Sequence, residues 1–434
     1  MYSRLKKGTR RMKIIFLCFF ILCPYFLWSA MPLAADAATA GANTAALFCS
    51  EMLQEKNSFA EQSDEKQAVP EQKELKLYAK AALLLDASNN RVLYEKDGYE
   101  VLPMASTTKI MTAVLALEYG NLEDEVTVSK RAASMPKVHL GMREGETYKL
   151  KDLLFSLMLE SHNDSAVAIA EHIGGSVEGF ADMMNQKARD IGCENTWFIT
   201  PNGLDATQGD KIHSTTAYDL AKIAAYAVSN DLFVALVGTK SHQFCELQSG
   251  RGFQVNNKDQ FLHMMDGAIG IKTGFTNQAG YCFVGALRTQ DRTLVSVVLA
   301  SGWPPHKSYK WTDTKALMSM GVKDYAVKNV EKKEIPESID VVNGTEGTVP
   351  LCMEWKELPI LLADWDKVLV SVEMKEELPA PVAKGEIAGY EKVMINGQLF
   401  AMIPVETAEA VGEYTYTYCL TEIVKRYLGG SGFR

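Results

Sequence analysis

The sequence predicts an α/β (α+β) fold in which a cluster of helices covers a mixed sheet, followed by a small all-β domain. Strand-like apolar segments occur at residues 81–95 and again at 253–300, with helical periodicity between them, which indicates one sheet packed against helices. Beyond residue 323 the pattern changes to short strands separated by Gly, Pro and charged turns. At 434 residues, of which 47% are apolar and 23% charged, the chain is long enough for two domains with a sizeable core.

The N-terminus has the pattern of a secretory signal. The first thirteen residues carry six basic side chains and no acidic one, an apolar run follows over residues 14–33, and small residues fill 34–40. This order predicts a signal peptide over residues 1–37, with cleavage after Ala37 or, alternatively, after Ala40. The apolar run also approaches the length that spans a bilayer, so an uncleaved membrane anchor is the competing interpretation. In either case the remaining chain is expected outside the cytoplasm.

The charge and composition of the remaining chain exclude several classes of function. The predicted signal peptide holds six basic residues and one acidic residue, so its removal lowers the net charge from −9 to −14. So acidic a protein is a poor binder of nucleic acid. The seven histidines have no clustered ligand spacing, so we expect no metal site, and no cofactor is expected either. The cysteines are scattered without a CxxC pair, and their pairing stays open.

The first predicted domain spans residues 77–322 and follows a polar spacer at 38–76. It begins with strands at 81–86 and 91–95, joined by a turn, and continues with a helix from Ser106 that is apolar on every side. Helical periodicity then recurs, and strand patterns return before a closing helix. The expected helices are 153–158, 164–172, 177–191, 217–228 and 311–320, and the expected strands are 125–128, 253–255, 268–274, 281–287 and 293–300.

The second predicted domain spans residues 323–413, with strands expected at 339–342, 368–372 and 392–395. The tail, residues 414–434, begins with strand-like alternation and continues as a short amphipathic helix. Docking of its apolar face onto its own domain is the favoured interpretation, and a peripheral membrane contact is the alternative. This face would consist of Leu420, Ile423, Val424, Tyr427 and Leu428.

Ser106 and Lys109 open the buried helix, three residues apart and therefore on one face. A lysine that enters a buried helix is costly unless it is paired or neutral. A hydroxyl beside such an amine is a nucleophile with its base. The alternative is an N-cap serine followed by a lysine that extends to the surface. The same spacing recurs at 63–66 and 134–137, so the spacing alone does not decide.

Two further short motifs follow Ser106 and Lys109 along the chain. Ser161-His162-Asn163 lies in the break between two helices, where its side chains can point into a cleft or simply cap the second helix. Lys272-Thr273-Gly274 ends a strand, where Gly274 leaves room for another backbone, or where the lysine is merely solvated. Each motif is weak alone. Serine-lysine, SxN and KTG in this order, on helix, loop and strand, form the set found in β-lactamases and penicillin-binding proteins.

Over residues 79–322 the chain resembles the low-molecular-mass penicillin-binding proteins that are D-alanyl-D-alanine carboxypeptidases. The resemblance implies a penicilloyl serine transferase or β-lactamase-like catalytic domain, with a mixed helical cluster and an antiparallel sheet. Residues 380–386 resemble the C-terminal β domain of this family. The segments that carry the resemblance in the first domain are 103–109, 163–166, 201–204, 213–217 and 270–276.

The resemblance implies a serine-type hydrolase that removes the terminal D-alanine from peptidoglycan stem pentapeptides through an acyl-enzyme. Ser106 would attack the penultimate D-alanine, Lys109 would accept its proton, and Ser161 would pass a proton to the leaving D-alanine. The oxyanion would lie between the backbone N–H groups of Ser106 and Phe275. The stem peptide would add as a strand along Gly274. The substrate-binding residues implied are Asn163, Lys272, Thr273, Gly274, Phe275 and Lys310.

The implied partners are stem peptides ending in D-Ala-D-Ala, and β-lactams as covalent inhibitors that leave Ser106 slowly. The implied location is the cell wall or the outer face of the cytoplasmic membrane, where the activity would serve peptidoglycan biosynthesis and cell shape. Two residues depart from the family's pattern. His162 stands where a small residue is common in the SxN motif, and we expect it to be packed or exposed rather than catalytic. Lys310 stands where some members have an arginine, so a substrate carboxylate would meet a point charge without a bidentate fork.

Three other functions compete with this interpretation. A DD-endopeptidase that cleaves cross-links would use the same residues. A non-catalytic penicillin-binding wall protein would keep the pocket without turnover. A β-lactamase would share the three motifs, but the chain has no clear counterpart of its deacylating glutamate, and the C-terminal β domain is foreign to it.

Overall fold

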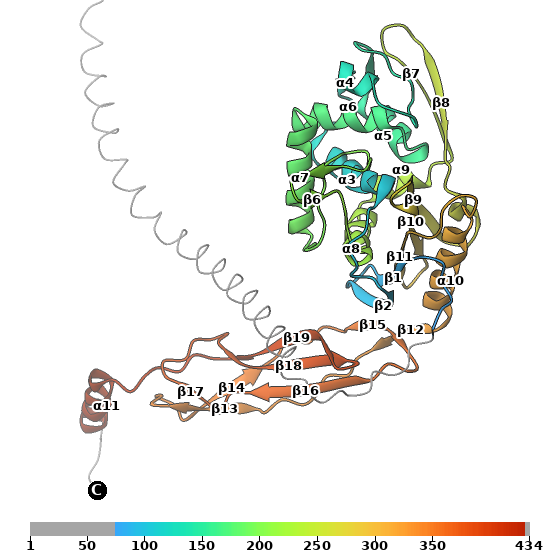
Figure 1. Ribbon diagram of the computed structural model, residues 1–434. Helices are drawn as coiled ribbons and strands as arrows, with labels where there is room; N and C mark the ends of the chain where they lie inside the picture. Colours follow the sequence, from blue (N-terminus) through green and yellow to red (C-terminus); the bar gives the residue numbers. More distant parts are fainter. Residues whose placement is uncertain (1–73, 430–434) are drawn as a thin grey trace, which may run out of the picture. The chain divides into compact units, whose positions relative to one another are not determined.

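The computed structural model describes residues 74–429. The predicted signal peptide and nearly all of the predicted spacer therefore lie outside the described residues. Figure 1 shows the helices and strands along the chain. Within the described part, no single helix is both long and apolar enough to span a bilayer, and α8 (Ala217–Val228) and α9 (Asp231–Gly238) reach that length only as a pair bent by 101°.

The catalytic part is built on a five-stranded antiparallel sheet in the order β2-β1-β11-β10-β9. Three of its strands, β1, β10 and β11, are buried along nearly their whole length, which explains their continuous apolar sequences. In the described part, β9 pairs with β10 alone and is therefore an edge strand. The bounds are β1 (Ala81–Asp86), β2 (Arg91–Lys96), β9 (Ala268–Thr276), β10 (Gly280–Arg288) and β11 (Thr293–Leu299).

Helices cover both faces of this sheet. Along β1, Leu83 and Leu85 belong to one buried cluster, whereas Ala82 and Leu84 belong to another, as the alternation of side chains along a strand requires. The second cluster includes Leu317 of α10 (Tyr309–Lys323), which packs on that face. The first, larger cluster lies under α3 (Lys109–Tyr119), α8 and the neighbouring helices.

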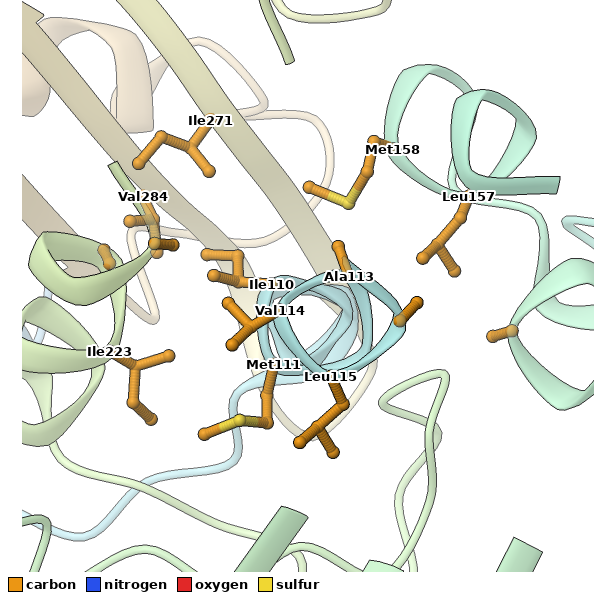
Figure 2. Packing of buried hydrophobic residues seen from close by; sticks show 14 of the residues in the cluster. Ile110, Met111, Ala113, Val114, Leu115, Leu157, Met158, Ile223, Ile271 and Val284 are labelled. Atoms are coloured by element: carbon orange, nitrogen blue, oxygen red, sulfur yellow. The ribbon is translucent and has the colours of Figure 1, made fainter. Parts of the chain in front are cut away.

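Helix α3 runs through the middle of the larger cluster. Figure 2 looks along the helix and shows apolar side chains on all sides of it. Ile110 points toward Ile271 of β9 and Val284 of β10, Val114 points to the side between Val284 and Ile223, and Leu157 and Met158 approach from a neighbouring helix. Because the helix is apolar all round, it is buried all round, as the sequence predicts.

The rest of the helical cluster supports the start of α3 and the loops beside it. Its helices are α4 (Lys130–Ala133), α5 (Leu150–Leu159), α6 (Asn163–Gly174), α7 (Val177–Asp190) and α9, with 3-10 turns η1 (Ala105–Thr108) and η2 (Gln260–His263). Three short antiparallel strand pairs belong to the same part of the chain: β3 (Glu125–Thr127) with β4 (Thr147–Lys149), β5 (Thr207–Gln208) with β6 (Lys211–Ile212), and β7 (Ser241–Cys245) with β8 (Gly252–Asn256).

The C-terminal part is all-β up to the tail. Its six-stranded sheet has the order β16-β18-β19-β14-β13-β17 and is antiparallel except for the β13–β17 pair. A separate pair joins β12 to β15. The bounds are β12 (Tyr325–Asn329), β13 (Ser338–Val342), β14 (Thr348–Cys352), β15 (Pro359–Ala363), β16 (Val368–Met374), β17 (Glu377–Pro379), β18 (Ile387–Ile395) and β19 (Gln398–Thr407).

These two parts confirm the predicted fold class, and the expected strands and helices of the first domain are present within a few residues. Helix α9 was not expected, because its eight residues, Asp231–Gly238, are a short apolar run without readable periodicity. The domain boundary drawn at residue 322 stays a prediction.

The prediction that the tail begins as a strand is wrong, because α11 (Tyr416–Gly429) already starts at Tyr416. Thr415 Oγ1 accepts a hydrogen bond from Tyr418 N–H at 3.1 Å, and the rings of Tyr414 and Tyr418 meet edge to face, a spacing that suits a helix. The apolar face predicted to dock is exposed, at 63% for Ile423 and 87% for Tyr427. Docking onto its own domain is therefore not observed within the described residues.

Candidate active site

Ser106 lies in η1, on a tightly enclosed turn directly ahead of α3. Ala105 has a φ of 50°, in the left-handed region that residues with a Cβ rarely adopt. A Cβ at Gly203 would lie 1.9 Å from the Ala105 carbonyl oxygen, and a Cβ at Gly274 would lie 3.1 Å from the Ser106 nitrogen. Backbone from two distant segments thus encloses the turn, and Gly203 is required for that close approach.

Lys109 follows one turn later, and its amine is directed back at the serine. Lys109 Nζ lies 3.0 Å from Ser106 Oγ, and it donates hydrogen bonds to Asn163 Oδ1 at 3.0 Å and to the Asn202 carbonyl oxygen at 2.5 Å. The side chain is fully buried. Burial, together with the positive charge of Lys272, holds the pKa of Lys109 well below its ordinary value, although Asp164 opposes this shift. The amine is thus biased toward the neutral form, which can take a proton from the hydroxyl.

The SxN motif brings Asn163 to Lys109, with Ser161 two residues before it in the chain. Asn163 Nδ2 donates to the Pro136 carbonyl oxygen at 3.2 Å, which identifies Oδ1 as the atom that faces Lys109. Ser161 has a φ of 67°, and its buried Oγ has no hydrogen-bond partner within the described residues. A buried hydroxyl without a partner, on strained backbone, is a feature of functional sites.

His162 is packed against residues outside the three motifs, as we expect. Its Nδ1 lies 2.8 Å from Ser156 Oγ and its Nε2 lies 3.4 Å from Glu160 Oε2. Burial lowers its pKa, and the nearby carboxylates oppose the shift only in part. His162 is a packed histidine that fixes the loop between α5 and α6.

The KTG motif lies on β9 beside the serine turn. Gly274 lets the strand approach, because a Cβ there would meet Ala105 Cβ at 3.1 Å as well as the Ser106 nitrogen. Lys272 is 3% exposed, and its Nζ donates to the Thr273 carbonyl oxygen at 3.1 Å. Burial lowers the pKa of Lys272 to about 7, with Lys310 adding to the shift and Asp259 opposing it. Its charge therefore depends on pH near neutrality.

Phe275 and Lys310 complete the β9 side of the site. The Phe275 ring is 39% exposed and lies 4.6 Å from the Tyr281 ring. Lys310, in the first turn of α10, is buried with its Nζ 5.0 Å from the centre of the Tyr281 ring and 4.9 Å from that of Trp311. Burial lowers the pKa of Lys310. Lys310 thus adds a second buried amine, whose charge lowers the pKa of Lys272.

Three residues at this site were assigned no role from the sequence. The Asn202 carbonyl oxygen accepts from Lys109, and a backbone acceptor leaves no signal in residue type. His213 lies behind the serine turn, 2.8 Å from Thr108 Oγ1. Asp259 is buried near Lys272, and burial raises its pKa to about 6. Its position in a polar loop gave no hint of burial. The segments that contain Asn202 and His213 were noted for their resemblance alone.

Taken together, the structure places a serine, a buried amine, an amide side chain and a strand that carries a lysine around one point, with Ser161 two residues before the amide in the chain. A hydroxyl hydrogen-bonded to a neutral amine can attack a carbonyl group. The backbone N–H of Ser106, at the start of a helix, suits a developing oxyanion. The edge of β9 that is unpaired within residues 74–429 can accept an extended peptide, with Lys272 available to pair with a carboxylate.

Comparison with known proteins agrees with this geometry. Residues 66–302 match the family model described as D-alanyl-D-alanine carboxypeptidase, and residues 326–413 match the C-terminal domain of penicillin-binding protein 5. The D-alanyl-D-alanine carboxypeptidase DacF of Bacillus subtilis is 29% identical over 81% of this chain and 90% of its own length. A D-alanyl-D-alanine endopeptidase of Escherichia coli is 28% identical over 50% of this chain and 70% of its own length.

Solved structures extend the comparison to three dimensions. Penicillin-binding protein 5 of Haemophilus influenzae is 27% identical, with a TM-score of 0.65, and the match covers 78% of this chain and 99% of that one. Penicillin-binding protein D2 of Listeria monocytogenes, solved in its ampicillin-bound form, is 27% identical with a TM-score of 0.51, covering 58% of this chain and 100% of that one. The chain therefore belongs to the D-alanyl-D-alanine carboxypeptidase family and is a serine-type peptidase.

Proposed function

We propose that Ser106 is the nucleophile that takes the acyl group of a peptidoglycan stem peptide ending in D-Ala-D-Ala. The observation that carries this assignment is the 3.0 Å contact between Lys109 Nζ and Ser106 Oγ inside a buried site. Because the pKa of Lys109 is held low, the amine accepts the hydroxyl proton as Ser106 Oγ attacks the carbonyl carbon of the penultimate D-alanine. Asn163 and the Asn202 carbonyl oxygen keep the amine in place for this step.

The oxyanion and the substrate carboxylate are bound by different groups. The backbone N–H groups of Ser106 and Phe275 are proposed to stabilise the oxyanion. The stem peptide extends β9 as an added strand along Gly274, which brings its terminal carboxylate to Thr273 and the charged form of Lys272. Lys310 adds a second amine near this carboxylate, although its charge lowers the pKa of Lys272. Support for this arrangement comes from the edge of β9, which has no strand partner in the described part of the chain, and from the burial of both lysines.

The leaving group and the second step complete the cycle. Ser161 Oγ, buried without a partner in the described part, is proposed to pass a proton to the nitrogen of the departing D-alanine. Water then attacks the acyl-enzyme, and Lys109 serves again as the base. A β-lactam offers a carbonyl to Ser106 in the same way, but no leaving group departs, so the adduct persists.

The experiment that tests this proposal measures D-alanine release from diacetyl-Lys-D-Ala-D-Ala by the chain that starts at residue 38. We expect release by this protein, no release by Ser106→Ala, and inhibition by penicillin. The absence of both D-alanine release and a penicillin adduct would contradict the proposal.

A DD-endopeptidase activity is the second candidate, and the match to relatives named endopeptidases favours testing it. Both reactions would use the same nucleophile, so the discriminating measurement compares substrates. Release of D-alanine from a pentapeptide without cleavage of a purified cross-linked dimer establishes the carboxypeptidase. The opposite selectivity establishes the endopeptidase.

We also propose that the chain is exported and cleaved after Ala37, and that α11 contacts the outer face of the membrane. The apolar residues of α11 recur at helical spacing and are exposed, from 45% at Val424 to 87% at Tyr427, beside Lys425 and Arg426. Export is tested by the N-terminal sequence of the native protein, which should begin at Ala38. Co-sedimentation with anionic lipid vesicles tests the contact, and Ile423→Asp should abolish it while sparing D-alanine release.

A further inference from the structure

A buried histidine that the proposed mechanism does not use lies behind the serine turn. The Ile199 backbone N–H donates to His213 Nδ1 at 2.9 Å, so this nitrogen carries no proton. Burial, together with the charge of Lys109, lowers the pKa of His213 to about 3, so the ring is neutral at physiological pH. A neutral imidazole with an unprotonated Nδ1 has its proton on Nε2. His213 is therefore a fixed donor at Nε2.

His213 Nε2 donates to Thr108, and this hydrogen bond connects the histidine to the serine turn. His213 Nε2 and Thr108 Oγ1 are 2.8 Å apart, and Thr108 Oγ1 lies 2.9 Å from the Ala105 carbonyl oxygen. Because Nε2–H donates to the hydroxyl oxygen, the hydroxyl proton is left for the Ala105 carbonyl. Both side chains are buried, Thr108 at 0% exposure, so water does not compete. The chain of hydrogen bonds has one direction only.

This chain ends on the peptide unit whose other end is the proposed oxyanion donor. The Ala105 C=O and the Ser106 N–H belong to one planar trans peptide and point in opposite directions. A hydrogen bond accepted by the carbonyl fixes the plane and polarises the N–H of the same unit. Fixing is needed here because Ala105, with a φ of 50°, holds an unfavourable conformation.

We propose that His213, acting through Thr108, is a positioning residue that orients the Ser106 N–H and strengthens it as the oxyanion donor. This proposal rests on the proposed acyl transfer at Ser106. It assigns a role in transition-state stabilisation to two residues that touch neither the substrate nor the attacking oxygen. The effect should therefore appear in kcat and spare substrate binding.

The turn contains its own matched control. Thr107 is also fully buried, and its Oγ1 donates to the Met104 carbonyl oxygen at 2.6 Å. That carbonyl belongs to the peptide unit with the Ala105 N–H, which has no part in the proposed oxyanion site. Thr107→Val and Thr108→Val thus remove the same kind of hydrogen bond from neighbouring positions. If these hydrogen bonds were purely structural, the two substitutions would lower kcat and boronate affinity to a similar extent.

The test measures kcat and KM for D-alanine release by the chain that starts at residue 38. It also measures the affinity of a peptide boronic acid that ends in a boronic analogue of D-alanine. Ser106 adds to the boron, and a boronate oxygen then occupies the oxyanion position. For Thr108→Val we expect kcat to fall about 10- to 100-fold, which is no more than the fall in kcat when a whole oxyanion donor is removed. KM should change less than about twofold. Boronate affinity should fall by the same factor as kcat. For Thr108→Ser and Thr107→Val both quantities should stay within about threefold of the native values.

His213→Asn gives an independent variant should Thr108→Val fail to fold, since an amide oxygen near the place of Nδ1 still accepts from Ile199 while the Nε2 donor is lost. This substitution should lower kcat and boronate affinity by the same factor, which should be smaller than the factor for Thr108→Val. Equal losses in Thr107→Val and Thr108→Val, or a fall in kcat without a matching fall in boronate affinity, would overturn the inference. An inactive native protein that no penicillin labels would instead overturn the proposed function, and this inference with it.

Discussion

The charge on Lys272 makes substrate binding sensitive to pH close to neutrality. The pKa of this lysine is lowered to about 7, and we assign its protonated form to the substrate carboxylate. With that value about nine-tenths of the side chain is charged at pH 6 and about one-tenth at pH 8. If binding needs the charge, kcat/KM for D-alanine release should fall roughly tenfold between pH 6 and pH 8. The sign follows because a lysine loses its charge as the pH rises through its pKa.

The assay compares kcat/KM with kcat across pH 6 to 9, using a tripeptide with a free carboxylate. A bound carboxylate raises the pKa of Lys272, so kcat at saturation should decline less than kcat/KM. Lys272→Arg is the control, because a guanidinium stays charged and should flatten the alkaline decline even if activity drops. Acylation by a penicillin methyl ester, which lacks the carboxylate, should not show the decline. A decline that is equal for acid and ester would refute the role given to Lys272.

Three further predictions follow from neighbouring residues. Asp259→Asn should move the alkaline decline of kcat/KM to lower pH, because the Asp259 charge raises the pKa of Lys272, and an unchanged midpoint would contradict this. Lys272→Met should stabilise the fold by a few kcal/mol near pH 6. Thermal unfolding should show this gain shrinking toward pH 10. Over this range the folded state releases the Lys272 proton, because its pKa is lowered, whereas the unfolded chain keeps the proton. Gly203→Ala should destabilise the protein and abolish acylation, since its Cβ would meet the Ala105 carbonyl oxygen at 1.9 Å, whereas Gly209→Ala, also at positive φ but with open space around it, should keep activity. Equal loss in both glycine variants would show that backbone strain, not the close approach, is responsible.

Much of the fold could be predicted because its elements carry strong periodicity. The buried helix α3 is apolar on every side, and β1, β10 and β11 are continuous apolar runs, so their type and order are readable from residues alone. The tail was misassigned because alternating Tyr and Thr read as a strand, whereas the local cap at Thr415 favours a helix. Local hydrogen bonds of this kind override propensity in a short segment.

The site was predictable only where function depends on side chains with a recognisable spacing. Ser106, Lys109, Asn163 and Lys272 come together as the three motifs suggested. The Asn202 contribution is a backbone carbonyl, which any residue could supply. The role proposed for His213 depends on its tautomer, which the hydrogen bond from the Ile199 N–H selects. A backbone hydrogen bond of this kind leaves no pattern in the sequence.

The central claim is that Ser106, activated by Lys109, forms a covalent acyl-enzyme. The most direct measurement is the intact mass of the protein after brief exposure to penicillin, followed by peptide mapping. The account predicts a mass increase of one whole penicillin molecule, located on Ser106, absent in Ser106→Ala and strongly slowed in Lys109→Met. An adduct on another residue, or unaltered labelling in Ser106→Ala, would contradict it.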